Sequence, residues 1–215
     1  MLVLVRHGQT QANAQRRLLG RAESPLTELG VQQARAIGRL LGPVGRLVSS
    51  PLRRARQTAE ALGLGLDIEV DDRWVEVDYG IYDGQPLGDV PAEVWQRWRT
   101  DPQYRPSGGE TLAQMGARVR GACDELFAEH GAARPEGDRG GDVVVVSHVS
   151  PIKAAVAWAL GAGDELAWRL YLATGSMTVI GWGAGGPVLH SYNLTVPQTG
   201  ASTASLSGRE GGRLS

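Results

Sequence analysis

Two histidines and two arginines stand out in this sequence because each lies just after an apolar stretch. Arg6 and His7 follow the run LVLV, Arg54 follows RLV after a short turn, and His148 closes the run VVVVSH. Arginine keeps its charge at working pH values, and its planar fork pairs with two phosphate oxygens. Two arginines would repel a divalent cation. The residue types therefore predict a phosphate site rather than a metal site.

The same group could do chemistry on a bound phosphate. A neutral imidazole at His7 can attack phosphorus and form a phosphohistidine that water then hydrolyses. Arg6, Arg54 and His148 would stabilise the charge that develops on the equatorial oxygens. The leaving alkoxide needs a proton, and Glu76, in DRWVEVDYGIYDG, is the candidate proton donor.

Close neighbours of these residues are the alternatives. Arg53 and Arg56 flank Arg54 on one predicted helix, where the interpretation as a solvated face is favoured for both. Asp78 lies two residues after Glu76 and competes with it as the acid.

Strands and helices that alternate along the chain would position these side chains. The apolar runs at 2–5 and 143–146 do not alternate with polar residues, which is typical of strands buried on both faces of a parallel sheet. A strand around residues 47–48 precedes a predicted helix with Ser50 as N-cap, Pro51 at the first position and Gly63 as C-cap.

Further elements follow the same alternation. Apolar spacing predicts helices over residues 31–41 and 112–126, and a second Ser-Pro start after His148 predicts another capped helix. Two late strands, SMTVIGW and PVLHSYNL, are joined by a glycine turn. The pattern indicates an α/β three-layer sandwich with a mostly parallel central sheet. In such sheets ligands bind beyond the carboxyl ends of the strands, so the four residues should converge there.

Composition limits the domain count and the partners. A chain of 215 residues with 42% hydrophobic content suits one domain, which we assign to residues 1–197. The polar, glycine-rich residues 198–215 are predicted to be a disordered tail. A net charge of −1 gives no global basic field of the kind that nucleic-acid binding needs.

The compartment is predicted from what the sequence contains near its start and from its cysteine usage. The N-terminus has no signal-peptide pattern, and LVLV is too short to span a bilayer, so no membrane partner is expected. The single cysteine, Cys123, lies in an apolar helical pattern and suits a reducing compartment. We expect a cytoplasmic protein.

Six blocks of sequence carry a resemblance to a known family: LVRHGQTQAN, SPLTELGVQQA, SSPLRRARQTAE, EVDYGIYDG, SGGET and VVVVSHVSPIKAA. In this order they resemble the successive motifs of the histidine phosphatase superfamily, which includes the cofactor-dependent phosphoglycerate mutases, and they cover roughly the first 195 residues. The resemblance implies a phosphoglycerate mutase-like fold and metal-independent phosphoryl transfer on a phosphomonoester.

The resemblance also implies roles for individual residues. His7 resembles the phosphorylated nucleophile, and Glu76 resembles the proton donor. Arg6, Arg54 and His148 resemble the residues of the family's phosphate pocket, and Asn13 resembles a further hydrogen-bond donor to the phosphate. Asn13 could instead cap a turn. Gly8 would let the backbone approach closely.

Two positions depart from the family pattern. Val149 and Ser150 follow the second histidine where relatives often have two glycines, so the N–H of Val149 remains available but the pocket wall differs. Leu19 stands where relatives often have a polar residue, which suggests a less polar leaving group.

The sequence favours hydrolysis of a small phosphate ester without a cofactor, by a monomer or homodimer. A true mutase is the alternative, although the segment between GIYDG and SGGE is compact for one. A non-catalytic phosphate-binding protein on the same scaffold is a second alternative. Trp95 and Trp98 lie on one helical face, where packing is favoured over a lid above the pocket.

Overall fold

The computed structural model describes residues 1–131, 141–183 and 185–197. Within these residues one six-stranded sheet has the order β3-β2-β4-β1-β5-β6. The strands are β1 (Leu2–Arg6), β2 (Val44–Ser49), β3 (Ile68–Val70), β4 (Asp142–Ser147), β5 (Ser176–Gly183) and β6 (Gly186–Thr195). Strands β1 to β4 pair in parallel, and β5 pairs antiparallel with both β1 and β6. The predicted, mostly parallel sheet is confirmed.

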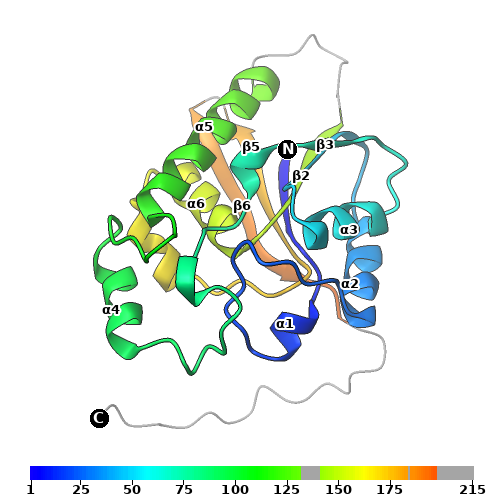
Figure 1. Cartoon of the computed structure of the whole chain (residues 1–215). Coiled ribbons are helices and arrows are strands. Elements are labelled where there is room, and N and C mark those ends of the chain that lie inside the picture. Colours follow the sequence, from blue (N-terminus) through cyan, green and yellow to red (C-terminus); the bar gives the residue numbers. More distant parts are fainter. Residues whose placement is uncertain (132–140, 184, 198–215) are drawn as a thin grey trace, which may run out of the picture.

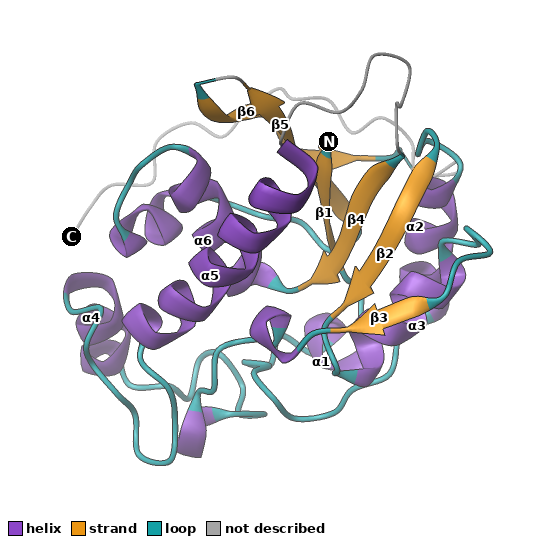
Figure 2. Ribbon diagram, turned by 90° about the horizontal axis from the view of Figure 1, so that it is seen from above, coloured by secondary structure: helices purple, strands orange, loops and turns teal. Residues whose placement is uncertain are grey.

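Helices cover both faces of this sheet (Figures 1 and 2). The α-helices are α1 (Gln11–Ala14), α2 (Glu28–Gly38), α3 (Arg53–Ala61), α4 (Ala92–Thr100), α5 (Leu112–Gly131) and α6 (Val149–Ala159). Short 3-10 turns are η1 (Asp72–Trp74), η2 (Gly80–Tyr82) and η3 (Asp164–Arg169). Figure 2 shows α2 and α3 on one side of the sheet and α5 and α6 on the other, which confirms the three layers.

The first strand explains why its sequence is apolar throughout. Leu2 and Leu4 belong to the core formed with α5 and α6, whereas Val3 and Val5 belong to the core formed with α2 and α3. Alternate side chains of a strand point to opposite faces, so a strand covered on both sides must be apolar at every position. All four side chains are buried.

The start of α3 differs from the prediction. The helix begins at Arg53 with Leu52 as N-cap and without a side-chain cap, and its C-cap is Leu62. The assignments of Ser50 as N-cap, Pro51 as the first helical residue and Gly63 as C-cap were therefore wrong. The Ser50 hydroxyl lies 2.7 Å from the His148 ring instead. Gly63, just after the helix, has φ +69°, a conformation that glycine adopts without strain.

Two short elements were not predicted from the sequence, and one predicted segment lies outside the described residues. The short elements β3 and α1 had no sequence signal of their own. The predicted tail at 198–215 lies outside the described residues. None of the helices built from the described residues combines the length and apolar character needed to cross a bilayer.

A close backbone contact fixes the segment after β1. A Cβ atom on Gly8 would meet the backbone of Gly30 in α2, and a Cβ on Gly30 would meet the carbonyl of Gln9. The two glycines therefore let the end of β1 lie directly against the first turn of α2. This contact holds the backbone beside His7 in place.

A pair of glycine substitutions in helices tests this contact. Gly30→Ala should lower the free energy of unfolding by about 1–3 kcal/mol, because its methyl group overpacks against backbone atoms. Gly121→Ala in α5 meets nothing within 4 Å and should raise it by about 0.5–1 kcal/mol. Urea unfolding of both variants measures the difference, and equal effects would contradict the close contact.

Candidate active site

The carboxyl ends of β1 and β4 lie side by side, because Arg6 at the end of β1 pairs in register with Ser147 at the end of β4. A cleft of about 250 Å³ opens beside them. Of the residues predicted from the sequence, Arg6, His7, Asn13, Glu76 and Val149 line this cleft. Arg54 and His148 are completely buried and lie beneath its surface.

The ring of His7 is held by its own segment of backbone. Its Nδ1 lies 2.8 Å from the carbonyl oxygen of Gly8. A carbonyl can only accept, so Nδ1 carries the proton and Nε2 of the neutral ring is unprotonated. Nε2 has no hydrogen-bond partner among the described residues. This tautomer presents the nitrogen lone pair that a nucleophile requires.

The surroundings of His7 keep its ring neutral. Burial lowers the pKa of His7 well below its usual value, and the nearby positive charges of Arg54 and Arg6 lower it further. The side chain is only 3% exposed. The His7 ring is therefore neutral at neutral pH.

His148 has the opposite tautomer. Its Nδ1 accepts a hydrogen bond from Nε of Arg54 at 3.2 Å, so the ring proton lies on Nε2, which donates to Ser50 Oγ at 2.7 Å. The centroids of the His148 and His7 rings are 5.1 Å apart. Burial, followed by the charge of Arg54, lowers the pKa of His148 well below its usual value.

Arg54 links His148 to a loop on the other side of the cleft. Its terminal nitrogens donate to the carbonyls of Ala22 and Gly20. With Nε bound to His148, these contacts use three of five N–H groups and leave one on each terminal nitrogen. Burial lowers the pKa of Arg54, and the nearby carboxylate of Glu76 opposes that effect.

The loop that receives Arg54 is itself held by a carboxylate. Asp83 accepts hydrogen bonds from the backbone N–H groups of Gly20, Arg21 and Ala22, each at 2.7 Å. The carbonyls of Gly20 and Ala22 are thereby fixed where they meet Arg54. Sequence reasoning did not find this role of Asp83, because it depends on two loops meeting in space.

Arg6 lies at the cleft with part of its hydrogen-bonding capacity unused. Its Nη1 donates to the carbonyl of Leu172 at 2.6 Å, whereas its buried Nε has no partner among the described residues. Burial lowers the pKa of Arg6 to about 10, so the side chain remains charged at neutral pH. A partly buried cation with a buried, unpaired donor favours an anionic ligand.

The structure separates the two candidate acids. Glu76 is 3% exposed and lines the cleft, and its carboxylate accepts from the N–H groups of Val77 at 2.8 Å and Ser150 at 3.3 Å. Asp78 accepts from the N–H of Gly80 and lies 3.6 Å from Arg21. Asp78 is not among the residues that line the cleft.

Asn13 can fill both roles that the sequence predicted for it, as a helix cap and as a hydrogen-bond donor to a ligand. Its side-chain oxygen accepts from the N–H of Thr10 in the capping box of α1. The amide nitrogen has no partner among the described residues, and the residue lines the cleft. Asn13 can therefore cap α1 and still donate to a ligand.

Several cleft residues were missed or left open by the sequence. Arg16 and Arg17 line the cleft beside Leu19 and add positive charge to it. Arg16 has φ 54°, a left-handed conformation that is uncommon outside glycine. The consecutive arginines in QRRLLG, close after Asn13, were the available signal. Among the described residues no cluster of histidine, cysteine and carboxylate side chains could hold a metal ion.

The arrangement agrees with comparison to known families. A family model described as histidine phosphatase superfamily (branch 1) matches residues 2–195. This chain belongs to the histidine phosphatase superfamily. The resemblance of the six sequence blocks is thereby confirmed.

Three similar proteins show how far along the chain the match extends. A bifunctional protein of Mycobacterium tuberculosis is 38% identical over 186 residues, which cover 83% of this chain but 49% of that protein, so the chain spans about half its length. GpmB of Cronobacter sakazakii, named a probable phosphoglycerate mutase, is 34% identical over 79% of each chain. The structure of mycobacterial glucosyl-3-phosphoglycerate phosphatase with VO3 has a TM-score of 0.79 at 33% identity, covering 90% of this chain and 98% of that one.

The two buried histidines of this histidine phosphatase superfamily member should make its stability fall in acid. Both pKa values lie well below 6.5 in the folded protein, so below pH 6.5 only the unfolded chain takes up protons at these sites. Each histidine should then contribute a loss of about 1.4 kcal/mol per pH unit until its folded pKa is reached. Urea unfolding between pH 7 and pH 5 measures this slope.

A variant separates the contribution of His7 to the pH dependence of stability from that of the carboxylates. His7→Gln should reduce the slope below pH 6.5 by about 1.4 kcal/mol per pH unit relative to the unchanged protein. An identical slope in both proteins would contradict a neutral His7.

Proposed function

We propose that this chain is a phosphatase that hydrolyses a small-molecule phosphomonoester through a phosphohistidine at His7, without a metal or cofactor. The observation that carries the proposal is the tautomer of His7. Its unprotonated Nε2 belongs to a ring that lines the same cleft as the cation Arg6 and the carboxyl of Glu76.

The reaction proceeds in two balanced steps. Nε2 of His7 forms a bond to phosphorus as the bond from phosphorus to the alcohol oxygen breaks, and Glu76 gives its proton to that oxygen. Water then forms a bond to phosphorus as the bond from phosphorus to Nε2 of His7 breaks, Glu76 takes a proton from the water, and inorganic phosphate leaves. Both proton transfers need Glu76 near the alcohol oxygen, which its place in the cleft wall permits.

Donors around the cleft would hold the transferred phosphoryl group. Arg6, the Asn13 amide and the N–H of Val149 at the start of α6 are on the cleft wall. A helix N-terminus adds unpaired N–H groups and a positive dipole end there. Arg54 and His148 lie beneath the cleft surface. When phosphate replaces their present hydrogen-bond partners, Arg54 would contribute positive charge, and both side chains would donate hydrogen bonds to it.

The comparisons support hydrolysis and keep the mutase as the alternative. The similar mycobacterial structure is named for a phosphatase of glucosyl-3-phosphoglycerate, and the relative from Cronobacter sakazakii is named for a mutase. A mutase would convert 3- to 2-phosphoglycerate and respond to 2,3-bisphosphoglycerate. Failure of that conversion, together with release of inorganic phosphate from simple esters, would exclude it.

The proposal also covers the domain boundaries, the cellular compartment and the oligomeric state. Residues 1–197 would form one histidine phosphatase domain that acts in the cytoplasm as a monomer or homodimer. The buried thiol of Cys123, whose pKa is raised by burial, supports a reducing compartment. Light scattering after size-exclusion chromatography would distinguish monomer from dimer.

His7 is the residue whose removal should abolish turnover. His7→Ala should release no phosphate from p-nitrophenyl phosphate above background and should take up no acid-labile phosphoryl label, while its circular dichroism spectrum is unchanged. His190→Ala, at an exposed position on β6, is the matched control and should behave like the unchanged protein. The unchanged protein should remain active in EDTA.

Absence of any EDTA-resistant hydrolysis from acid to neutral pH would favour the non-catalytic phosphate-binding alternative. Near-normal turnover of His7→Ala would remove the assignment of the nucleophile.

The role of Glu76 is tested with leaving groups of different basicity. Glu76→Gln should lower kcat/KM for phenyl phosphate by about 100-fold or more, because the basic phenolate must be protonated as it leaves. The loss for p-nitrophenyl phosphate should be much smaller. Asp78→Asn is the matched control and should not separate the two substrates; equal losses in Glu76→Gln would point to another acid.

A further inference from the structure

A second chamber adjoins the cleft that contains His7. Its cavity volume is about 100 Å³, room for one ring-sized group, and it shares the wall residues Leu18, Tyr79 and Val149 with the first cleft. The alcohol part of a phosphate ester bound at His7 could therefore extend from the first cleft into this chamber. The chamber is the natural place for part of the alcohol that the phosphate is attached to.

Indole rings form much of the chamber wall. Trp95 and Trp98 come from α4 and Trp168 from η3, with ring centroids 5.3 Å apart for the first pair and 6.5 Å for Trp95 and Trp168. Trp98 is 2% exposed, so it packs in a core and lines the chamber at once. The buried Nε1 of Trp168 has no acceptor among the described residues. Such walls suit a flat or apolar group that carries an oxygen acceptor.

Among the described residues that line this chamber, one carries a charge. Lys153 lines the chamber and follows Val149 by four residues on α6, so both lie on the same side of that helix. It is the single lysine of the chain, whereas the other 21 basic residues are arginines. It is half-buried, and among the described residues no carboxylate lies within salt-bridge distance of its ammonium group.

The surroundings of Lys153 are unfavourable for an isolated charge. Burial lowers the pKa of Lys153; the carboxylate of Glu76 opposes this effect, and the charge of Arg6 adds to it. An ammonium group that is partly removed from water and has no carboxylate within salt-bridge distance loses solvation that no direct ion pair replaces. A negatively charged ligand group in the chamber would supply the missing partner.

We propose that this chamber binds the alcohol part of the substrate and that Lys153 pairs with a carboxylate or similar anion on it. The substrate class is then a phosphomonoester whose alcohol carries a compact ring or apolar group and a second negative charge. This inference rests on the proposed phosphatase function for its placement of the phosphate. It assigns Lys153 to substrate specificity rather than to the chemical step.

Matched substrates measure this specificity. The carboxyphenyl phosphates, 3- and 4-substituted, have nearly the same shape as the corresponding carbamoylphenyl phosphates but carry one more negative charge. The readout is the ratio of kcat/KM for the carboxylate to that for the amide, compared between proteins so that intrinsic reactivity cancels. Lys153→Met should lower this ratio by about 10-fold or more for at least one isomer, as expected for loss of a charge-assisted hydrogen bond.

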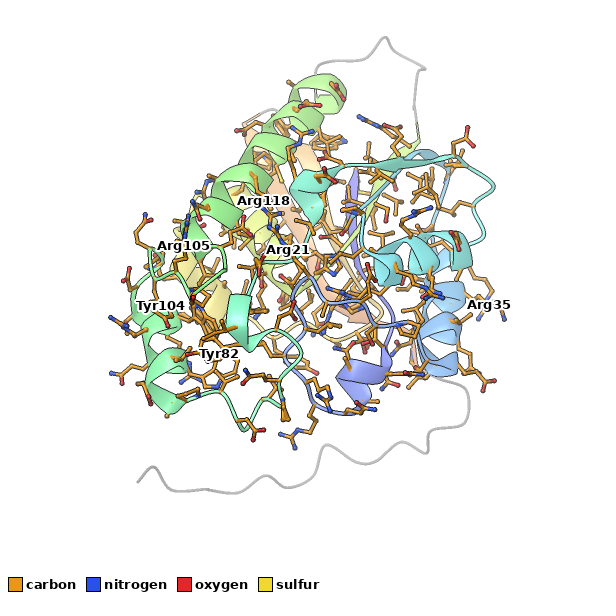
Figure 3. All side chains as sticks on the ribbon, in the orientation of Figure 1. Arg21, Arg35, Tyr82, Tyr104, Arg105 and Arg118 are labelled. Atoms are coloured by element: carbon orange, nitrogen blue, oxygen red, sulfur yellow. The ribbon has the colours of Figure 1, made fainter. Side chains whose placement is uncertain are left out.

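A second variant controls for net charge. Arg35→Met removes one positive charge from the exposed face of α2, which Figure 3 shows on the opposite side of the molecule from Tyr104 beside α4. It should leave the ratio unchanged. Equal losses on carboxylate and amide in Lys153→Met, with a shifted pH profile, would mean that Lys153 acts through Glu76 and would overturn the proposal.

The single lysine allows a test that needs no catalysis. Reductive methylation with 13C-formaldehyde labels only the amines of Met1 and Lys153 and preserves the positive charge. Titration with 3- and 4-hydroxybenzoate should shift the Lys153 methyl signal in the NMR spectrum, and the corresponding hydroxybenzamides should shift it much less. The Met1 signal should stay in place.

The two tests separate the subsite from the phosphatase function. A Lys153 shift with the benzoates but no hydrolysis of any ester would keep the subsite and remove the proposed function. Hydrolysis without a preference for the carboxylates and without a benzoate-specific shift would remove the subsite and keep the function.

Discussion

The burial of Arg54 is the constraint on which the site depends. This side chain is completely buried, and among the described residues no carboxylate lies within salt-bridge distance of it. A buried cation is costly unless its donors are satisfied, and here two carbonyls and one imidazole satisfy three of them. The loop that provides the carbonyls is fixed by Asp83, and the imidazole is fixed by Ser50. Burial lowers the pKa of His7, and the charge of Arg54 lowers it further, so one buried guanidinium contributes to the fold, to the tautomer of His148 and to the neutral state of His7.

The arrangement is electrostatically incomplete without an anion. Arg6 and Arg54 both lie close to His7, and burial lowers the pKa of both arginines. A phosphoryl group would supply the negative charge that these cations lack, and its developing charge would be stabilised more strongly than in water because the groups are already desolvated. The folded protein carries this cost before the substrate binds, which is how a preorganised site differs from one that assembles around its ligand.

Much of the fold followed from local patterns because the sheet is covered on both faces. The unbroken apolar runs of β1 and β4 could only be buried strands, and the helices between them showed regular spacing. The failures occurred where tertiary contacts decide. The strand β3 has three residues and forms by pairing with β2. Ser50 is not the N-cap of α3 because the helix begins at Arg53, and its hydroxyl lies 2.7 Å from the ring of His148. Local capping rules cannot foresee a contact with a residue 98 positions away.

The sequence predicted which residues form the site but not which of them line the cleft and which lie beneath it. Residues at the ends of strands could be grouped from topology alone, which brought Arg6, His7 and His148 together. The sequence could not show that His148 and Arg54 lie beneath the cleft, nor that Lys153 faces a second chamber, because both depend on how α4 and η3 pack against α6.

The hydrogen bond between His7 and the Gly8 carbonyl has a consequence for the identity of the covalent intermediate. A ring whose Nδ1–H donates to a backbone oxygen can accept a phosphoryl group only at Nε2. In the proposed reaction a single positional isomer of phosphohistidine therefore forms. The ring need not rotate between the two half-reactions, since the same bond persists through both. The position of phosphorylation is thus set by one peptide carbonyl, that of the next residue along the chain.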